Sequence, residues 1–203
     1  MGKRTRVIGL VGPVASGKTV VAGMLAELGA AVVNADEVNR ALLAPGQPLL
    51  AKVAEAFGEQ CLRPDGSLDR AALARHVFSD RAALERLEAL VHPPMKAEIA
   101  RRVQEALDAG APLVVVEAAV LYRMTAADLV DCVVMVTADR GERLRRLIED
   151  VGLPPADAEQ RVALHEQLGL DRVPADYVID TTTGRDAARA QAYAIWRRLL
   201  GCA

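Results

Sequence analysis

The segment that most restricts the fold of this chain is residues 12–19, Gly-Pro-Val-Ala-Ser-Gly-Lys-Thr, which fits the pattern G-x-x-x-x-G-K-[ST]. It follows an apolar run at residues 7–11 and precedes a stretch rich in Val, Ala, Met and Leu that favours a helix. A strand, a glycine-rich loop and a helix in this order form a phosphate loop, because the loop amides converge on one anion at the start of the helix. We therefore expect this segment to bind a nucleoside triphosphate.

Each residue type that the pattern specifies has a physical role. Gly12 and Gly17 let the backbone bend tightly and approach the phosphates without a Cβ, so that successive N–H groups point inward. Lys18 is expected to bridge the β- and γ-phosphates and to follow the γ-phosphoryl group as it leaves, while the Thr19 hydroxyl coordinates Mg²⁺. The rest of the predicted nucleotide-binding loop, which acts through shape and backbone, is Pro13, Val14, Ala15 and Ser16.

Short apolar runs without alternation recur along the chain, at residues 7–11, 31–34, 113–116, 132–136 and 177–179, separated by helical patterns. This arrangement is typical of a parallel sheet buried on both faces and joined by right-handed crossovers. Helices are expected over 47–57, 69–78, 80–91, 94–109 and 185–200. The sequence predicts an α/β fold of the P-loop NTPase type, a parallel sheet flanked by helices. The core spans about 1–44 and 111–203, with a helical substrate-binding insertion at about 45–110 and a small helical lid at about 150–174.

Composition limits the partners and the compartment. The net charge of −2 and pI near 6.0 do not favour nucleic acid or an anionic membrane, and 3% aromatic residues offer no stacking platform for single strands. No apolar run approaches the roughly 20 residues that cross a bilayer, and residues 3–6, Lys-Arg-Thr-Arg, lead into a strand rather than a signal-peptide core. Cys61, Cys132 and Cys202 are far apart and odd in number, which fits neither a disulfide framework nor a zinc site. We expect a cytoplasmic protein, monomeric or a small homo-oligomer.

A phosphate loop alone does not say what is phosphorylated. The two helical insertions favour a kinase, because a kinase must exclude water from the transferred group with a substrate-covering unit and a closing lid. A GTPase would instead carry an Asn-Lys-x-Asp base reader and an apolar strand ending in Asp-x-x-Gly, and neither occurs here.

Four segments together resemble the dephospho-coenzyme A kinase family. They are the phosphate loop, Val-Asn-Ala-Asp-Glu-Val at 33–38, Leu-Glu-Ala-Leu-Val-His-Pro at 87–93 and Ala-Asp-Tyr-Val-Ile-Asp at 175–180. The resemblance spans nearly the whole chain. It implies transfer of the γ-phosphoryl group of ATP, with Mg²⁺, to the ribose 3′-hydroxyl of dephospho-coenzyme A, the last step of coenzyme A synthesis.

The resemblance implies roles for Asp36 and His92, and position suggests roles for Arg40 and Glu117. Asp36 becomes the general base or hydroxyl-orienting group. The alternative is that it caps the helix that starts near Glu37, and the two roles are compatible. Arg40 either binds a substrate phosphate or pairs with Asp36. His92 either binds substrate or is a buried histidine at a helix break. Glu117, at the end of the third strand, either holds a Mg²⁺-bound water or is an ordinary strand-end carboxylate.

The chain departs from the family pattern at four positions: Asn34 stands for the first Asp of Asp-Ala-Asp, Asp150 for the second lid arginine, His165 for the lid glutamine and Thr181 for an asparagine. Loss of a phosphate-clamping cation predicts that another arginine substitutes, with Arg146 first, Arg161 second and Arg143 also available. The alternatives are a diverged P-loop kinase of another nucleoside-like or alcohol substrate, or a non-catalytic nucleotide-binding homologue.

Overall fold

A computed structural model gives the structure of the chain and describes residues 6–78 and 80–201. The chain forms two compact units, residues 1–33 with 102–203, and residues 34–101. The second unit begins earlier than the predicted insertion at about 45, because helix α2 (Ala35–Leu42) packs on α3 (Pro48–Phe57). It also ends earlier than the predicted limit near 110.

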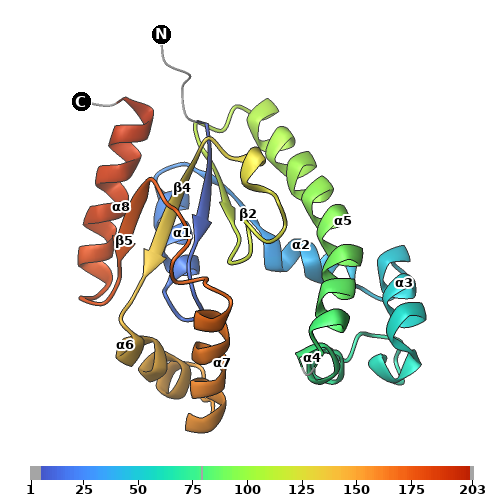
Figure 1. Cartoon of the computed structure of the whole chain (residues 1–203). Coiled ribbons are helices and arrows are strands. Elements are labelled where there is room, and N and C mark those ends of the chain that lie inside the picture. Colours follow the sequence, from blue (N-terminus) through green and yellow to red (C-terminus); the bar gives the residue numbers. More distant parts are fainter. Residues whose placement is uncertain (1–5, 79, 202–203) are drawn as a thin grey trace. The chain divides into compact units, whose positions relative to one another are not determined.

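A five-stranded sheet forms the centre of the first unit, in the order β2-β3-β1-β4-β5 (Figure 1). The strands are β1 (Val7–Val11), β2 (Ala31–Asn34), β3 (Val114–Glu117), β4 (Cys132–Thr137) and β5 (Tyr177–Asp180). β1 pairs in parallel with β3 and β4, and β4 with β5, as the unbroken apolar runs predict. β3, β4 and β5 each end one residue later than predicted, because the backbones of Glu117, Thr137 and Asp180 still pair with a neighbouring strand.

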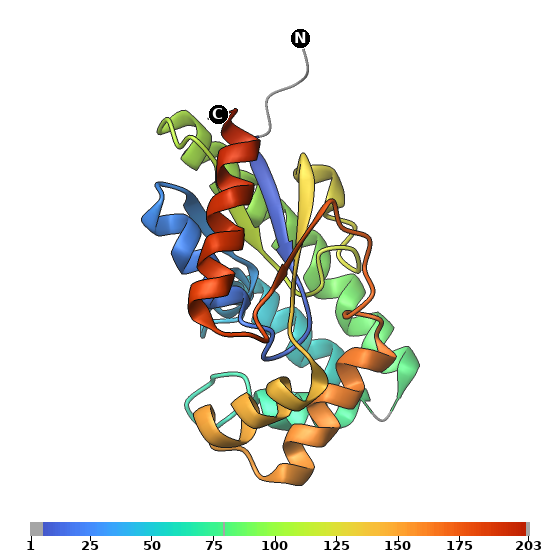
Figure 2. The same ribbon diagram turned by 90° about the vertical axis from the view of Figure 1, so that its left-hand side faces the viewer.

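Two helices, α1 (Lys18–Glu27) and α8 (Arg185–Leu200), pack on each other and on the sheet (Figures 1 and 2). They bury an aliphatic core that includes Ile8, Leu10, Val21, Leu25, Val134, Ile179, Ala192 and Ile195. Trp196 of α8 is half-buried and packs against this core. This core fixes the start of α1, and with it the phosphate loop. A 3₁₀ turn at Ala127–Leu129 precedes β4.

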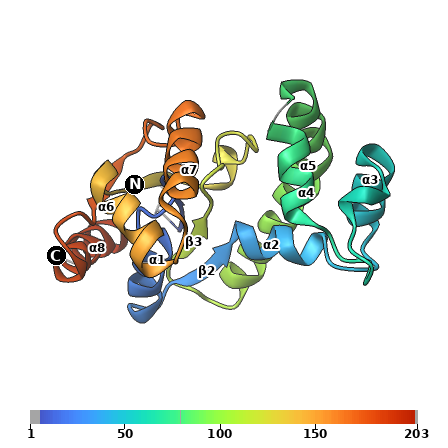
Figure 3. The ribbon, with the colours of Figure 1, turned by 90° about the horizontal axis from the view of Figure 1, so that it is seen from below.

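The segment between β4 and β5 is helical. It comprises α6 (Arg140–Arg145), a π-helical turn (Arg146–Asp150) and α7 (Pro155–Gln167), and α6 and α7 lie side by side (Figure 3). A separate small core of Leu147, Ala158 and Val162 holds these helices, and Val14 and Ala15 of the phosphate loop pack against it. α7 begins at Pro155, because the fixed φ of proline suits the first turn of a helix.

After Asn34, the regular elements of the described part of the second unit are helices and 3₁₀ turns, apart from a short bridge between Leu62 and Leu68. Besides α2 and α3 it contains a 3₁₀ turn (Glu59–Cys61), α4 (Arg70–Phe78) and most of α5 (Arg81–Asp108). The prediction of separate helices over 80–91 and 94–109 is wrong, since α5 runs through Pro93 and Pro94. Val91, Met95, Ile99 and Val103 are buried at four-residue spacing on both sides of the prolines. One continuous apolar stripe therefore keeps the helix together where proline alone predicts a break.

Candidate active site

The phosphate loop joins β1 to α1 and has the backbone geometry that its glycines predict. Gly12 has a φ of 147°, and a Cβ there would collide with the carbonyl oxygen of Val136 on β4. Gly17, with a φ of 88°, is in the left-handed region immediately before α1. Both positions therefore require glycine, one for close approach and one for conformation.

Lys18 lies at the start of α1 and turns back over the loop. Its Nζ donates hydrogen bonds to the carbonyl oxygens of Gly12, at 2.9 Å, and Pro13, at 3.0 Å. The side chain is half-buried and is not part of the core. The ammonium group is thus already held above the loop, where a phosphate can exchange for the carbonyl contacts.

Thr19 is joined to a strand-end carboxylate. Its hydroxyl donates a 2.7 Å hydrogen bond to Oε1 of Glu117, whose side chain is buried at the end of β3. A hydroxyl beside a carboxylate supplies the oxygen ligands that Mg²⁺ prefers. In the described part of the chain, no group of three or more His, Cys, Asp or Glu residues could hold a metal ion.

Arg146 supports the phosphate loop from the π-helical turn. Its Nη1 donates to the carbonyl oxygen of Ala15 (3.0 Å) and to Oγ1 of Thr181 (2.9 Å), and its Nη2 donates to the carbonyl oxygen of Thr181 (2.8 Å). The Thr181 hydroxyl in turn donates to the carbonyl oxygen of Ser16 at 2.8 Å. Ala15 is a non-glycine residue with a φ of 57°, which costs of order 1–3 kcal/mol. The arginine therefore offsets strain in the loop.

The position of Arg146 is itself fixed by a carboxylate. Its Nε donates to Oε1 of Glu142 on α6 at 2.8 Å. Hydrogen bonds from Arg145 and then from Arg146 lower the pKa of Glu142 from its ordinary 4.5 to about 2. Glu142 thus stays ionised through the ordinary pH range and keeps the guanidinium aligned with the loop. Sequence reasoning did not foresee the roles of Glu142 and Thr181 in this support.

The other two candidate arginines are placed differently. Arg161 is exposed on α7, with no hydrogen bond or ion pair to another residue in the described ranges. Arg143 is only 4% exposed on α6, and its Nη2 donates to Oε1 of Glu166 at 2.7 Å. Neither makes a hydrogen bond to the phosphate loop among the residues that the structure describes.

His165, on α7, contacts the phosphate loop directly. The backbone N–H of Val14 donates to its Nδ1 at 3.1 Å. Sequence reasoning noted His165 only as a departure from a family pattern. A partner 151 residues away along the chain leaves no local signal that could reveal this contact.

The acceptor-side candidates belong to the second unit. Asp36 and Arg40 are exposed on α2 and form no ion pair with each other in the described structure, while His92 is half-buried within α5 rather than at a helix break. The cap of α2 is Asn34, whose Oδ1 accepts from the N–H groups of Asp36 (2.8 Å) and Glu37 (3.1 Å). The alternative that Asp36 caps this helix is therefore wrong. The spacing of Asn34 and Glu37, typical of a capping box, is the signal that could have identified the cap.

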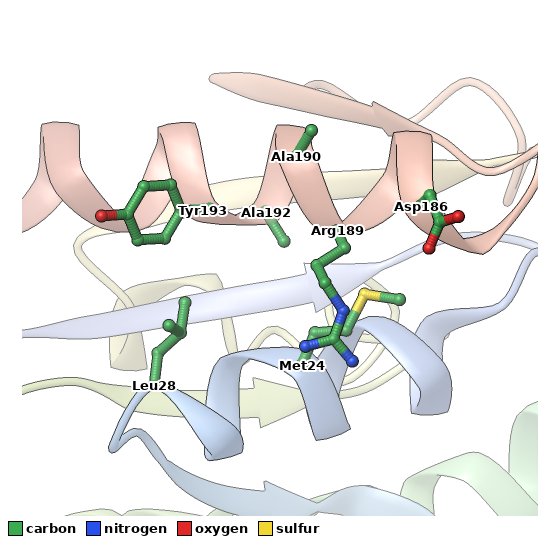
Figure 4. A pocket seen from close by; sticks show the side chains of 7 residues that line it. All are labelled: Met24, Leu28, Asp186, Arg189, Ala190, Ala192 and Tyr193. Carbon is green, nitrogen blue, oxygen red and sulfur yellow. The ribbon is translucent and has the colours of Figure 1, made fainter.

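A pocket of about 410 Å³ lies between α1 and α8, apart from all these residues (Figure 4). It is lined by Met24, Leu28, Asp186, Arg189, Ala190, Ala192 and Tyr193. Arg189 also forms a 2.6 Å ion pair with Glu27, which joins the two helices at this place. The pocket includes none of the predicted site residues.

The cysteines behave as packing residues. Cys61 and Cys132 are free thiols, and Cys202 lies outside the described residues. Burial first, and then the charges of Asp176 and Asp131, raise the pKa of the Cys132 thiol to about 11, so it stays protonated. None of the described helices is long and apolar enough to span a membrane.

Comparison with known proteins identifies the family of this fold and loop. The sequence model of the dephospho-CoA kinase family matches residues 6–186. The chain belongs to the dephospho-CoA kinase family. The dephospho-CoA kinase of Symbiobacterium thermophilum is 43% identical over 97% of this chain and 82% of its own length.

Solved structures support the same kinase fold. The protein TT1252 from Thermus thermophilus is 30% identical, with a TM-score of 0.76 over 97% of this chain and 99% of its own. The dephospho-CoA kinase from Campylobacter jejuni, at 20% identity, has a TM-score of 0.60 over 97% of this chain and 98% of its own. The P-loop kinase fold predicted from the sequence is thereby confirmed.

At two positions where the chain departs from the dephospho-CoA kinase pattern, the structure shows what the substituted side chain contacts. Thr181, where an asparagine is expected, joins Arg146 to the phosphate loop. Asp150, where a lid arginine is expected, has a 59% exposed side chain that lies 3.6 Å from Arg145. The carboxylate is thus partly neutralised by a neighbouring cation.

Proposed function

We propose that this chain transfers the γ-phosphoryl group of ATP to the 3′-hydroxyl of the ribose of dephospho-CoA, giving CoA and ADP. The observation that carries the proposal is the family match over residues 6–186, which includes the phosphate loop. Its glycine, lysine and threonine positions have the geometry described above. A non-catalytic homologue would need the loop but not the acceptor-side carboxylate Asp36.

On the donor side, the loop residues 12–19 bind the triphosphate through their amides. Lys18 exchanges its carbonyl partners for the β- and γ-phosphates and stabilises the charge that develops as the γ-phosphoryl group leaves. Mg²⁺ would be held by the Thr19 hydroxyl, with Glu117 holding a water of its shell, as their 2.7 Å contact favours. When bound, the ion neutralises phosphate charge.

On the acceptor side, Asp36 orients the ribose hydroxyl and accepts its proton late in a loose transition state. Arg40 and His92 bind the phosphate and the body of the substrate. The roles of Asp36 and His92 rest on the match of their motifs to the family, and the role of Arg40 rests on its place one helical turn after Asp36. The exposure of Asp36 and Arg40 on α2 leaves both side chains accessible to a substrate.

The missing lid arginine is replaced in function by two others. Arg146 acts through the loop, because its donors hold the carbonyl groups of Ala15 and Thr181. Arg161 is the mobile cation, since it is exposed on α7 and can reach the phosphates when the lid closes. Arg146 is therefore the positioning arginine and Arg161 the phosphate-binding arginine.

The proposal is tested by coupled ADP release with dephospho-CoA, adenosine and a simple vitamin alcohol as acceptors. We expect release that depends on dephospho-CoA and is absent with the other two. If ADP were released equally fast or faster with another acceptor, the chain would be a diverged kinase of that acceptor. If the chain bound nucleotide but turned over none of the acceptors, it would be a non-catalytic homologue.

A further inference from the structure

One amide of the phosphate loop is already occupied by a side chain of the lid. The N–H of Val14 donates to Nδ1 of the half-buried His165 at 3.1 Å. Amides of such a loop are the groups that bind phosphate oxygens. A lid residue and the nucleotide therefore compete for the same donor.

The contact defines the chemical state of the histidine. Nδ1 accepts a hydrogen bond only when it carries a lone pair, so the imidazole is neutral and its proton lies on Nε2. A neutral acceptor satisfies the amide without bringing the negative charge that a phosphate would bring. Such a contact is strong enough to hold the loop and weak enough for an anion to displace, because charge-assisted hydrogen bonds are about twice as strong as neutral ones.

We infer that His165 is a positioning residue that docks α7 on the phosphate loop and yields the Val14 amide to a phosphate oxygen of the incoming nucleotide. Release of His165 frees the lid helix to rearrange around the bound donor. The inference rests on the proposed function only in taking ATP as that donor.

The lid keeps its other attachments when this contact is lost. The small core of Leu147, Ala158 and Val162 holds α7, and Glu166 pairs with the buried Arg143 of α6 at 2.7 Å. The His165 contact is thus a separate tie between α7 and the loop. Its removal should change nucleotide affinity without unfolding the lid.

The first test is calorimetric binding of ADP and of a non-hydrolysable ATP analogue, without acceptor, at about pH 8, where an ordinary histidine is neutral. His165→Ala should bind both nucleotides about 2- to 10-fold more tightly, because they no longer displace a hydrogen bond of typical net strength. The KM for ATP should fall with it while kcat changes little. His165→Gln, which retains an acceptor, should remain close to the wild type.

The matched control is Gln160→Ala, an exposed position on the same helix, which should leave affinity unchanged. Thermal melting of each variant checks that the lid stays folded. Weaker or unchanged binding by a folded His165→Ala variant would overturn the inference, and weaker binding would make His165 a nucleotide ligand instead.

The second test uses ¹⁵N NMR to observe the hydrogen bond between the Val14 amide and Nδ1 of His165 directly. Without added nucleotide, Nδ1 of His165 should appear unprotonated, and saturation with ADP should shift both this signal and the Val14 amide. Absence of any shift at these two groups would contradict the exchange. The calorimetric and NMR measurements use nucleotide alone, so failure of the enzyme to phosphorylate dephospho-CoA would refute the proposed function and leave this inference standing.

Discussion

At the scale of single residues, the proposed phosphoryl transfer depends most on Lys18. Its ammonium group lies over the loop carbonyls of Gly12 and Pro13 and outside the core. Lys18→Ala should remove most turnover, because the charge that follows the γ-phosphate is lost, while the melting temperature changes little. Parallel turnover and melting measurements check this, and a variant with wild-type turnover would contradict a kinase mechanism.

Asp36 should separate acceptor chemistry from donor binding. Asn34 already caps α2, so Asp36→Asn leaves the helix start intact. We expect nearly unchanged ATP affinity and a sharply lower kcat, because the amide can accept a hydrogen bond but cannot take the proton. A comparable loss in ATP binding would assign Asp36 to the metal, and an unchanged kcat would remove its catalytic role.

Arg146 should affect both stability and catalysis, since it holds the loop rather than only contacting a ligand. Arg146→Ala leaves the carbonyl groups of Ala15 and Thr181 without their charged donor, and should cost at least about 2 kcal/mol in the free energy of unfolding and in kcat/KM for ATP. Arg146→Lys should rescue only part of this, because an ammonium group lacks the planar fork. Denaturant unfolding and steady-state kinetics measure the two effects, and full rescue by lysine would reduce the role to charge alone.

At the scale of elements, the junction of α6 and the π-helical turn should be sensitive to acid. The pKa of Glu142 is lowered to about 2 in the folded chain, so its contribution is complete above the ordinary value of 4.5 and is lost as the pH falls from there toward 2. The stability difference between wild type and Glu142→Gln should therefore be constant above about pH 5.5 and shrink below about 4.5. Urea unfolding across this range measures it.

The control for this effect is Glu149→Gln. Glu149 contacts the same Arg145 from the π-helical turn, but its side chain is 62% exposed against 21% for Glu142. We expect a smaller stability difference from this variant, because solvent screens an exposed pair. Equal behaviour of the two variants would show that the contact with Arg146 adds nothing to Glu142.

Elements dominated by one local signal were predictable from sequence. The strands were predictable because buried parallel strands appear in a sequence as unbroken apolar runs. The phosphate loop was predictable because its backbone geometry requires glycine at fixed positions. α5 was mispredicted because Pro93 is a local break signal, whereas the buried stripe that overrides it, including Val91 and Met95, spans the whole helix. Long-range contacts such as Arg146 with Ala15 leave no such local trace.

At the scale of the whole molecule, the chain combines a phosphate loop of the expected geometry with a departure from the family pattern in the proposed lid. Asp150 stands where the family pattern has an arginine, and the phosphate loop is contacted by Arg146 and His165. Both contacts come from the helical segment between β4 and β5. The account therefore predicts that the lid acts on the nucleotide partly through the loop.

Phosphorylation of the ribose 3′-hydroxyl is tested most directly by the ³¹P NMR spectrum of the products formed from ATP and dephospho-CoA. We expect a new phosphomonoester on the 3′ position of the ribose, formed in equal amount with ADP and strongly reduced with the Lys18→Ala variant. Inorganic phosphate in place of that ester, or an ester at another position, would contradict it.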